Sequence, residues 1–370
     1  MVSSKEKFND SLPKNKVVRN KLHYHYIPPC YISSNKVDLE KINTIYFSNE
    51  YGIGDNFVAR SFIKKVVETF PDKEFYSIHQ FGPTLLKDIP QIKEIKSKDY
   101  KDKFGKKIPF WVDNKTRTTK NPIGYDQLAE DEFGGLHINT WYHSLQEMAS
   151  KYYNGSAFPV LIYNFQHLFY ALGMKEIKNA EDYLPSVDYS YYDTGPLTNK
   201  LEEIRKKFDK VVLVCNEVPS TKDIVRRFDF DSFLVPKVKS NPRTAFIHTV
   251  PMDSEQLRYL GNVKNVFYTD NILSKKDKPD VIYMGFIAKY CDTIIGRMSG
   301  PMACTLTKEH LVDKPKQFLA TTDWPMLCEW AMERDSSKLD YVSPFDPQEW
   351  WSLLGKHFGD DLQKGTYSFG

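Results

Sequence analysis

The chain has 370 residues, enough for two domains of ordinary size, and its 41% hydrophobic and 27% charged residues are typical of a globular protein. A net charge of +3, from 51 basic and 48 acidic residues, gives no strong nucleic-acid signal, because that function needs a concentrated basic face. Five scattered cysteines without a CxxC pair indicate neither a disulfide framework nor a zinc site, and they favour a cytoplasmic protein. The polar N-terminus lacks the apolar region of a signal peptide, and no run of about 18 apolar residues predicts a transmembrane segment.

The first half of the chain predicts alternating strands and helices after a polar N-terminal extension at residues 1–40. An apolar run at residues 42–48 predicts a strand, and a glycine turn leads into a helix at 56–70 with apolar residues at spacing four. Residues 74–79 predict the next strand. Strand, glycine turn, helix and strand in this order open a doubly wound α/β domain, which we assign to residues 41–180.

The later part of this domain contains less regular patterns. Residues 108–112 predict a strand, and residues 139–153 and 159–172 predict helices. The glycine- and charge-rich stretch 116–137 predicts loops on the ligand side of the domain. Residues 181–197 have the composition of a linker between two domains.

A second α/β alternation occupies residues 198–345, which we assign as a second domain. Its predicted strands are 210–215, 244–249, 265–269, 292–295 and 317–320, and its predicted helices are 201–208, 254–260, 280–289, 302–308 and 324–333. Residues 346–370 form a C-terminal segment, in which the pattern predicts a helix at 347–358. One expectation is that this helix packs back on the first domain. The fold class predicted is therefore α/β, with two Rossmann-like domains facing a cleft.

The first glycine turn is a candidate catalytic element. Gly52, Gly54 and Asn56 surround Asp55 just after the first predicted strand, so this turn should lie at the carboxyl end of that strand, near the cleft. An acid in this position can take a proton from an acceptor hydroxyl. The alternative is that Asp55 is a helix N-cap favoured by the helix dipole, and one residue can serve both roles.

The second candidate element is the turn that follows the strand at 292–295. Ser299 stands at the N-cap position of the next helix, and Gly300 and Pro301 follow in its first turn. The free backbone N–H groups of such a turn form an anion site, for which a phosphate is the usual occupant, and Arg297 in the turn would add a charged fork. The alternative is an ordinary strand-to-helix turn without a ligand.

Other candidates have weaker support. Lys222 lies beyond a predicted strand and loop, from where it could reach donor phosphates, although a solvated surface lysine is the alternative. His137, Trp141 and His143 are candidates for an acceptor pocket, and the alternative for the two histidines is an ordinary core or surface position.

Two further patterns argue against other enzyme classes. Asp229-Phe230-Asp231 matches the short DxD string that binds a metal ion and a diphosphate in one large class of glycosyltransferases. A string of this length arises easily by chance. We therefore assign no metal site. Gly52-x-Gly54 lacks the third glycine of a dinucleotide fingerprint, which disfavours an NAD enzyme.

Two stretches carry a resemblance to a known family. Residues 52–63, GIGDNFVARSFI, resemble the N-terminal signature of the bacterial heptosyltransferases, which transfer a sugar from ADP-heptose to lipopolysaccharide. Residues 292–303, DTIIGRMSGPMA, are similar to the donor-binding strand, turn and helix of the same enzymes. The resemblance implies a GT-B-like fold, with an acceptor-side N-terminal domain, a nucleotide-sugar C-terminal domain, and inverting chemistry without a metal.

The same resemblance implies roles for individual residues. Asp55 matches the catalytic base, and Ser299 with Gly300 matches the residues that hold the donor diphosphate. The family usually has an acid where Met298 stands and a histidine where Ala303 stands, so these departures leave the sugar and the nucleotide open.

Together the patterns predict a glycosyltransferase that moves a sugar from a nucleotide-diphosphate sugar to an acceptor hydroxyl. The donor is a co-substrate and no cofactor is expected. The acceptor class stays open between a glycan, a lipid-linked glycan and another hydroxyl compound. The alternatives are a nucleotide-sugar epimerase of the same fold and a non-catalytic protein that binds a nucleotide-sugar or a glycan.

Overall fold

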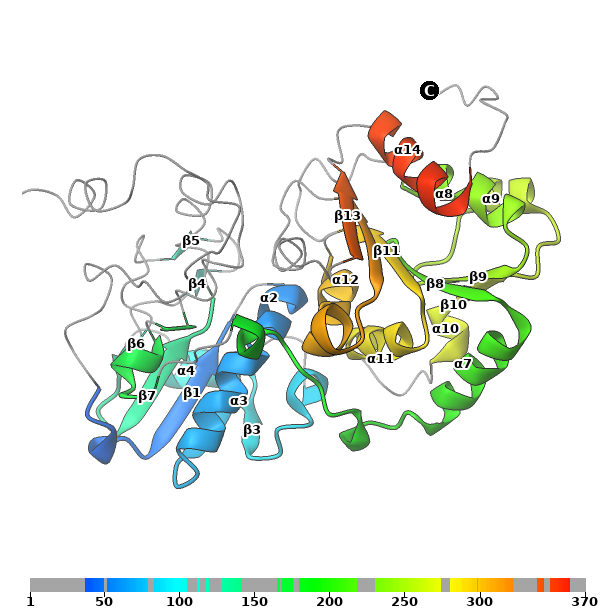
Figure 1. The fold of residues 1–370 in the computed structure, drawn as a ribbon. Coiled ribbons are helices and arrows are strands. Elements are labelled where there is room, and N and C mark those ends of the chain that lie inside the picture. The colour runs from blue at the N-terminus through cyan, green and yellow to red at the C-terminus, as the bar shows by residue number, and fades with distance from the viewer. Residues whose placement is uncertain are drawn as a thin grey trace, which may run out of the picture. The chain divides into compact units, whose positions relative to one another are not determined.

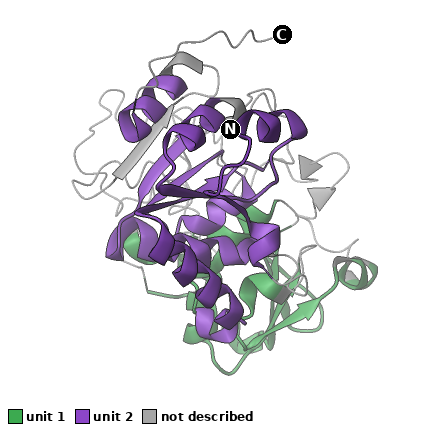
Figure 2. Cartoon of the chain, turned by 90° about the vertical axis from the view of Figure 1, so that its right-hand side faces the viewer, with its two compact units in different colours: residues 1–188, 326–335 green, residues 189–325, 336–370 purple. Residues whose placement is uncertain are grey.

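The computed structural model divides the chain into two compact units, which Figure 2 colours separately. Unit 1 is Met1–Asp188 with Met326–Asp335, and unit 2 is Tyr189–Pro325 with Ser336–Gly370. The residues that the structure describes are 37–49, 52–78, 83–104, 112–113, 118–119, 128–141, 165–166, 168–175, 180–217, 230–273, 280–297, 299–321, 338–342 and 347–359. The division after Asp188 falls inside the range that has linker composition.

Unit 1 is built on a five-stranded sheet in the order β3-β2-β1-β7-β6 (Figure 1). Its strands are β1 (Thr44–Ser48), β2 (Glu74–Ile78), β3 (Ile92–Ile95), β6 (Leu128–Glu130) and β7 (Gly135–Asn139), and β4 (Val112–Asp113) and β5 (Thr118–Thr119) form a separate antiparallel pair. Strands β3, β2, β1 and β7 are parallel, whereas β6 is antiparallel to β7. Strands β1 and β7 are buried along almost their whole length, as expected of central parallel strands covered on both faces.

Aromatic side chains join the helices of unit 1 to this sheet. The helices are α2 (Ile53–Val58), α3 (Arg60–Thr69) and α4 (Ser97–Phe104), with 3₁₀ turns at Leu39–Lys41, Pro83–Leu86 and Ala180–Tyr183. Phe62 of α3 packs edge-on against Phe47 of β1 and stacks on Phe165, with ring centroids 5.0 Å apart. Tyr100 of α4 packs beside Tyr46 in a cluster on the other face of the sheet.

The strands predicted at 42–48 and 74–79 are confirmed, but three expectations for unit 1 are wrong in detail. The helix predicted at 56–70 is two helices, α2 and α3, and it begins earlier. The stretch expected to form loops contains β6 and the start of β7, because Gly134 takes a positive φ of 79° and turns the chain between them. The helix expected to begin at Asn139 does not begin there, since Asn139 ends β7 and Trp141 lies in an irregular segment.

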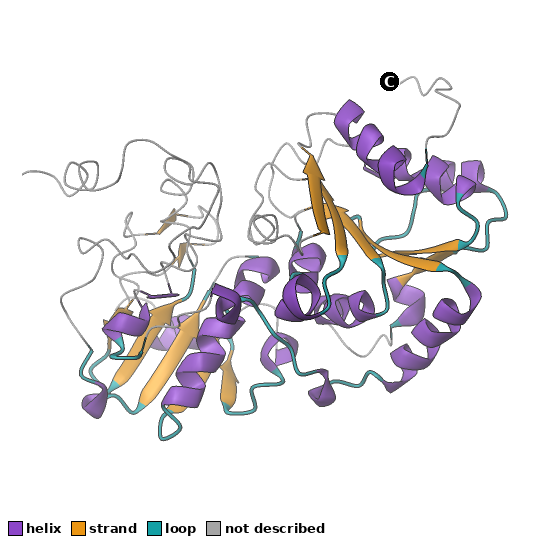
Figure 3. Ribbon diagram, viewed as in Figure 1, coloured by secondary structure: helices purple, strands orange, loops and turns teal. Residues whose placement is uncertain are grey.

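Unit 2 contains a six-stranded parallel sheet in the order β10-β9-β8-β11-β12-β13 (Figures 1 and 3). Its strands are β8 (Lys210–Cys215), β9 (Thr244–His248), β10 (Val266–Tyr268), β11 (Thr293–Arg297), β12 (Gln317–Thr321) and β13 (Lys338–Val342). The first five match the predicted strands closely, whereas β13 was not predicted. The predicted class, α/β with two Rossmann-like domains, is therefore confirmed at the level of each unit.

The helices of unit 2 cover both faces of its sheet. They are α7 (Gly195–Lys207), α8 (Phe230–Ser240), α9 (Ser254–Leu260), α10 (Thr269–Ile272), α11 (Tyr283–Lys289), α12 (Gly300–Thr305) and α14 (Pro347–Phe358), with a π-helix at Glu309–Asp313 and 3₁₀ turns at Tyr189–Tyr191 and Asp280–Ile282. In Figure 1, α8, α9 and α14 lie on one side of the sheet, and α7, α11 and α12 lie on the other. Helix α9 has the predicted bounds, α8 was not predicted, and the helix predicted at 324–333 lies outside the described residues.

Helix α14 packs within unit 2, so the expectation that the C-terminal helix packs back on the first domain is wrong. Trp350 and Leu354 are fully buried against Ile295 and Leu319 of the central strands. Lys237 of α8 donates to the backbone oxygen of Gly359 at 2.6 Å, just beyond the helix. An apolar helix face finds its free-energy minimum on the nearest apolar sheet face, and here that face belongs to the second sheet. Among the described helices, none has the length and apolar character needed to cross a membrane.

Candidate functional site

The first candidate turn joins β1 to α2 and is closed by one side chain. Gly52 is the N-cap residue of α2, in extended conformation. The Asn56 carboxamide donates through Nδ2 to the backbone oxygen of Asn49 at 3.2 Å and to that of Gly52 at 3.1 Å. Both ends of the turn are therefore held by the same amide group, and the start of α2 is fixed against the end of β1.

Asp55 lies in the first turn of α2 and is partly exposed. It is not the N-cap residue, which is Gly52, and no side chain caps this helix. A Cβ atom added to Gly52 would lie 3.1 Å from Oδ2 of Asp55, so the carboxylate lies against the glycine. A carboxylate in a first helical turn is favoured by the helix dipole, and its partial exposure leaves it accessible to a substrate. Gly54, also in α2, is partly buried.

The second candidate turn joins β11 to α12. Gly296 packs closely, because a Cβ atom there would lie 2.8 Å from Sδ of Met302 and 2.9 Å from Cβ of Cys215. Ser299 is the N-cap residue of α12, as predicted, but the helix spans Gly300–Thr305 rather than 302–308. The Ser299 side chain makes no capping bond, and its buried hydroxyl has no hydrogen-bond partner among the described residues.

The chemistry available at this turn comes from its backbone and from that hydroxyl. Gly300 and Met302 lie in the first turn of α12, where N–H groups have no intrahelical acceptor, and Pro301 between them has no N–H. The first intrahelical bond is donated by Ala303 to the backbone oxygen of Ser299 at 2.9 Å. A turn of this kind can offer donors to an oxygen-rich group.

Arg297 differs from its predicted position. It is the last residue of β11 rather than a turn residue, and it is 4% exposed. Side chains alternate along a strand, and Gly296 faces Met302 of α12, so Arg297 leaves the backbone on the opposite face of the sheet.

His137 belongs to the core of unit 1 rather than to an acceptor pocket. It is fully buried in β7, with Nε2 2.9 Å from Oδ2 of Asp131 and Nδ1 2.7 Å from the Tyr100 hydroxyl, and the Tyr46 ring stacks on it. Burial lowers the pKa of His137, against the opposing effect of Asp131. Burial opposes ionisation of Asp131, but hydrogen bonds from His137 and from the N–H groups of Gly135 and Phe133 lower its pKa. The neutral ring therefore donates to the carboxylate and accepts from the tyrosine.

The remaining sequence candidates are Trp141, His143 and Lys222. Trp141 is buried, and its backbone N–H donates to Oδ1 of Asn139 at 3.0 Å. His143, Lys222 and Met298 lie outside the described residues. Asp229 of the DxD string also lies outside them, and the described part of the chain holds no group of three or more metal-ligating side chains.

The carboxyl edge of the second sheet contains two polar residues that the sequence analysis missed. Asn216, just after β8, accepts at Oδ1 from the Val250 N–H at 2.9 Å and donates through Nδ2 to the Val250 oxygen at 3.0 Å. His248, at the end of β9, is fully buried, and neither ring nitrogen has a hydrogen-bond partner among the residues that the structure describes. Burial lowers the pKa of His248 to about 3, so the ring is neutral. A polar residue at the end of an apolar strand was the available sequence signal for both.

The chain is similar to solved glycosyltransferase structures at low sequence identity. The glycosyl transferase family 9 protein from Veillonella parvula DSM 2008 is 11% identical, with 90% of this chain and 94% of that chain covered and a TM-score of 0.47. E. coli ADP-heptose lps heptosyltransferase II is 11% identical, with 85% and 98% covered and a TM-score of 0.45. E. coli heptosyltransferase WaaC, solved with ADP, is 8% identical, with 85% and 99% covered and a TM-score of 0.41.

No family model matches the chain, and no curated protein matches it.

Proposed function

We propose that the protein is a glycosyltransferase that uses a nucleotide-diphosphate sugar, with Asp55 as the base and the β11–α12 turn as the diphosphate site. One observation carries this proposal: each candidate turn follows a strand at the point where the strand order of its sheet reverses. In unit 1 the chain leaves β1 toward β2 and β3 on one side, whereas β7 pairs on the other. In unit 2 the strands β8, β9 and β10 extend one way, and β11, β12 and β13 the other. Ligands of parallel α/β sheets bind outside the carboxyl ends of the strands at such reversal points.

On the acceptor side, Asp55 takes the proton of the attacking hydroxyl. Its carboxylate is partly exposed, and the turn that holds it is fixed by Asn56. As the hydroxyl oxygen attacks the anomeric carbon, the bond to the donor diphosphate breaks and the proton passes to Asp55. A positioned general base accelerates such a step by about 10²–10⁴-fold. Direct attack of this kind inverts the configuration at the anomeric carbon.

On the donor side, the β11–α12 turn stabilises the leaving diphosphate. The Ser299 hydroxyl and the N–H groups of Gly300 and Met302 are the donors, and Arg297 at the end of β11 contributes positive charge. Fixed donors directed at a developing negative charge lower the barrier without reorganisation during the reaction. The negative charge is then balanced by the protein, and the chemistry proceeds without a metal ion.

A thermal-shift screen of nucleotide-sugars, with the matching nucleosides as controls, tests this function. The expected result is an increase in melting temperature with one or more nucleotide-sugars and with their nucleoside diphosphates. The nucleosides should cause almost no increase. Release of nucleoside diphosphate from the ligand that binds then separates a transferase from a protein that only binds. No shift with any nucleotide-sugar or nucleoside diphosphate would contradict the proposal.

A further inference from the structure

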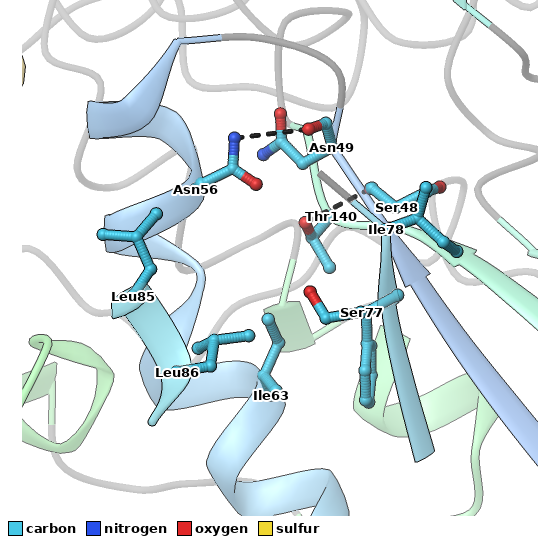
Figure 4. Close-up of a pocket in the computed structure, with 10 residues that line it drawn as sticks. Ser48, Asn49, Asn56, Ile63, Ser77, Ile78, Leu85, Leu86 and Thr140 are labelled. Atoms are coloured by element: carbon cyan, nitrogen blue, oxygen red, sulfur yellow. Dashed lines mark hydrogen bonds between the residues drawn. The ribbon is translucent and has the colours of Figure 1, made fainter. Parts of the chain in front are cut away.

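A small polar hollow lies at the carboxyl end of the first sheet, and Asn56, the residue after the proposed base, is part of its lining (Figure 4). Its polar lining comes from the ends of three parallel strands and from α2, and the remaining lining is apolar. The polar residues are Ser48, Asn49, Asn56, Ser77 and Thr140. Because Asn56 follows Asp55 directly in α2, the hollow and the carboxylate belong to the same end of one helix.

Ser77 is the residue that marks this hollow as a site. It pairs in register with Phe47 and follows Phe75 on the face of the sheet that α3 covers. Phe47 and Phe75 stack there, so a serine interrupts an aromatic surface at a position that is 5% exposed. Figure 4 shows the Ser77 hydroxyl directed into the hollow, and it makes no hydrogen bond to any described residue. A ligand hydroxyl in the hollow could therefore donate to the Ser77 hydroxyl or accept from it.

The other polar groups are held in place but can still accept or donate. The Thr140 hydroxyl donates to the backbone oxygen of Ser48 at 3.4 Å, and the Ser48 hydroxyl donates to that of Ile138 at the same distance. These are long bonds, and each hydroxyl oxygen keeps lone pairs for a further donor.

The size and charge of the hollow limit what can enter. It holds about 10 Å³ of space for the centre of a water-sized group, which corresponds to roughly one water molecule or one hydroxyl. Among the residues that the structure describes, its lining contains no acid, lysine, arginine or histidine. A phosphate or carboxylate would lose its hydration there without gaining a counter-charge, whereas a neutral hydroxyl would find several partners.

We infer that this pocket receives one hydroxyl of a neutral polyhydroxyl acceptor, such as an uncharged sugar residue at the end of a glycan. The inference rests on the proposed function and names the acceptor class for it. One hydroxyl of the sugar enters beside Ser77, and a neighbouring hydroxyl lies outside the pocket for deprotonation by Asp55. An acceptor that presents an anionic group at this point is excluded by the neutral lining.

Saturation-transfer NMR on the full chain, without any donor, tests the pocket. The probes are glycerol and the methyl glycosides of glucose, galactose and mannose, with methyl glucuronate and inorganic phosphate as anionic probes. Ser77→Ala removes the hydroxyl, and Ser77→Val also fills the space. Ser254→Ala, at an exposed serine of unit 2, is the matched control. Melting temperatures of all variants check that they are folded.

The expected result is millimolar binding of at least one neutral probe, weakened roughly fivefold to tenfold by Ser77→Ala and more by Ser77→Val, and unchanged by Ser254→Ala. Absence of binding by every neutral probe, or equal binding by the parent and folded Ser77→Val, would overturn the inference. Equally tight, Ser77-dependent binding of glucuronate or phosphate would overturn the neutral class. Nucleoside diphosphate binding in the same samples reports separately on the proposed function, so a failure of one is distinguished from a failure of the other.

Discussion

The turn after β1 and the turn after β11 are built on the same plan but are held by different forces. The β1–α2 turn is closed by polar bonds from the Asn56 side chain, and it leaves Asp55 partly exposed. The β11–α12 turn is held by close packing at Gly296, and it buries Ser299. A polar, partly open turn suits proton transfer, whereas a packed turn with fixed donors suits recognition of a charged leaving group.

Replacing Asp55 by asparagine should have the largest effect and should act on the rate alone. Asparagine keeps the shape of the side chain but cannot take a proton, so turnover should fall by about 10²–10⁴-fold. Donor affinity should stay within a few-fold of the parent, because the proposed diphosphate site lies in unit 2. Steady-state kinetics and a donor titration measure the two effects. Glu68→Gln, at an exposed acid of α3, is the control, and near-parent turnover of Asp55→Asn would reduce Asp55 to a helix-stabilising residue.

Replacing Arg297 by alanine should act on binding at the other turn. A charge-assisted bond to the diphosphate contributes about 1.5–3 kcal/mol, so nucleoside diphosphate affinity should fall by about one to two orders of magnitude. Affinity for the bare nucleoside should hardly change. Isothermal titration with both ligands measures this, and Arg258→Ala, on the exposed side of α9, is the control. Equal losses for both ligands would mean that the end of β11 was only destabilised.

A pair of glycine-to-alanine changes should separate the two turns. At Gly296 the new Cβ would meet Met302 and Cys215 at less than a normal contact distance, and overpacking of this kind costs about 1–3 kcal/mol of stability. Among the described residues, the new Cβ at Gly52 would meet only the end of the Asp55 side chain, so the cost should be below about 1 kcal/mol. Chemical denaturation measures both. Gly52→Ala should instead lower turnover by displacing the carboxylate, and the reverse pattern of stabilities would contradict the comparison.

Acid should weaken unit 2 through His248. The pKa of this ring is about 3 in the folded chain and about 6.5 when unfolded, so the unfolded chain binds the proton more readily between these values. The stability that the neutral ring maintains above pH 6.5 is therefore lost as the pH falls, by roughly 1.4 kcal/mol at pH 5.5. His248→Leu should remove that part of the pH dependence. Denaturation of parent and variant at pH 7.5 and 5.5 measures it, and parallel losses in both proteins would contradict the assignment.

Removal of metal ions should have the smallest effect. The proposed mechanism balances the diphosphate charge with the N–H groups of the β11–α12 turn and with Arg297, so excess EDTA should leave turnover within about twofold of the untreated enzyme. Loss of activity that manganese or magnesium restores would show that a metal ion takes that role. The Asp229-Phe230-Asp231 string would then be a candidate metal site.

The sequence was most informative where a local pattern decides the structure. The apolar runs of β1, β8 and β11 and the cap signal at Ser299 are local, and they were predicted correctly. Strand β7 was missed because its turn depends on a single residue, Gly134, in a charged stretch that resembles a loop. The position of α14 was missed because an amphipathic helix does not specify which apolar face it will cover.

The site was predictable in the same uneven way. Asp55 was identified by its turn, but its place after the N-cap rather than at it depends on Gly52. Arg297 was assigned to the turn because Gly296 was read as the end of the strand, whereas β11 continues through Gly296 to Arg297. The polar hollow had no sequence signal, since Ser48, Ser77 and Thr140 come from strands far apart in the chain and meet only through the sheet register.

The most direct test of the central claim is the anomeric configuration of the sugar that the enzyme releases or transfers. The donor that binds in the thermal-shift screen is incubated with the full chain, and proton NMR follows the product from its first appearance. We predict one nucleoside diphosphate per sugar transferred, a product of inverted anomeric configuration, and loss of both signals in Asp55→Asn. Retained configuration, or a bound donor that the parent enzyme never cleaves with any acceptor, would contradict a single displacement in which Asp55 is the base.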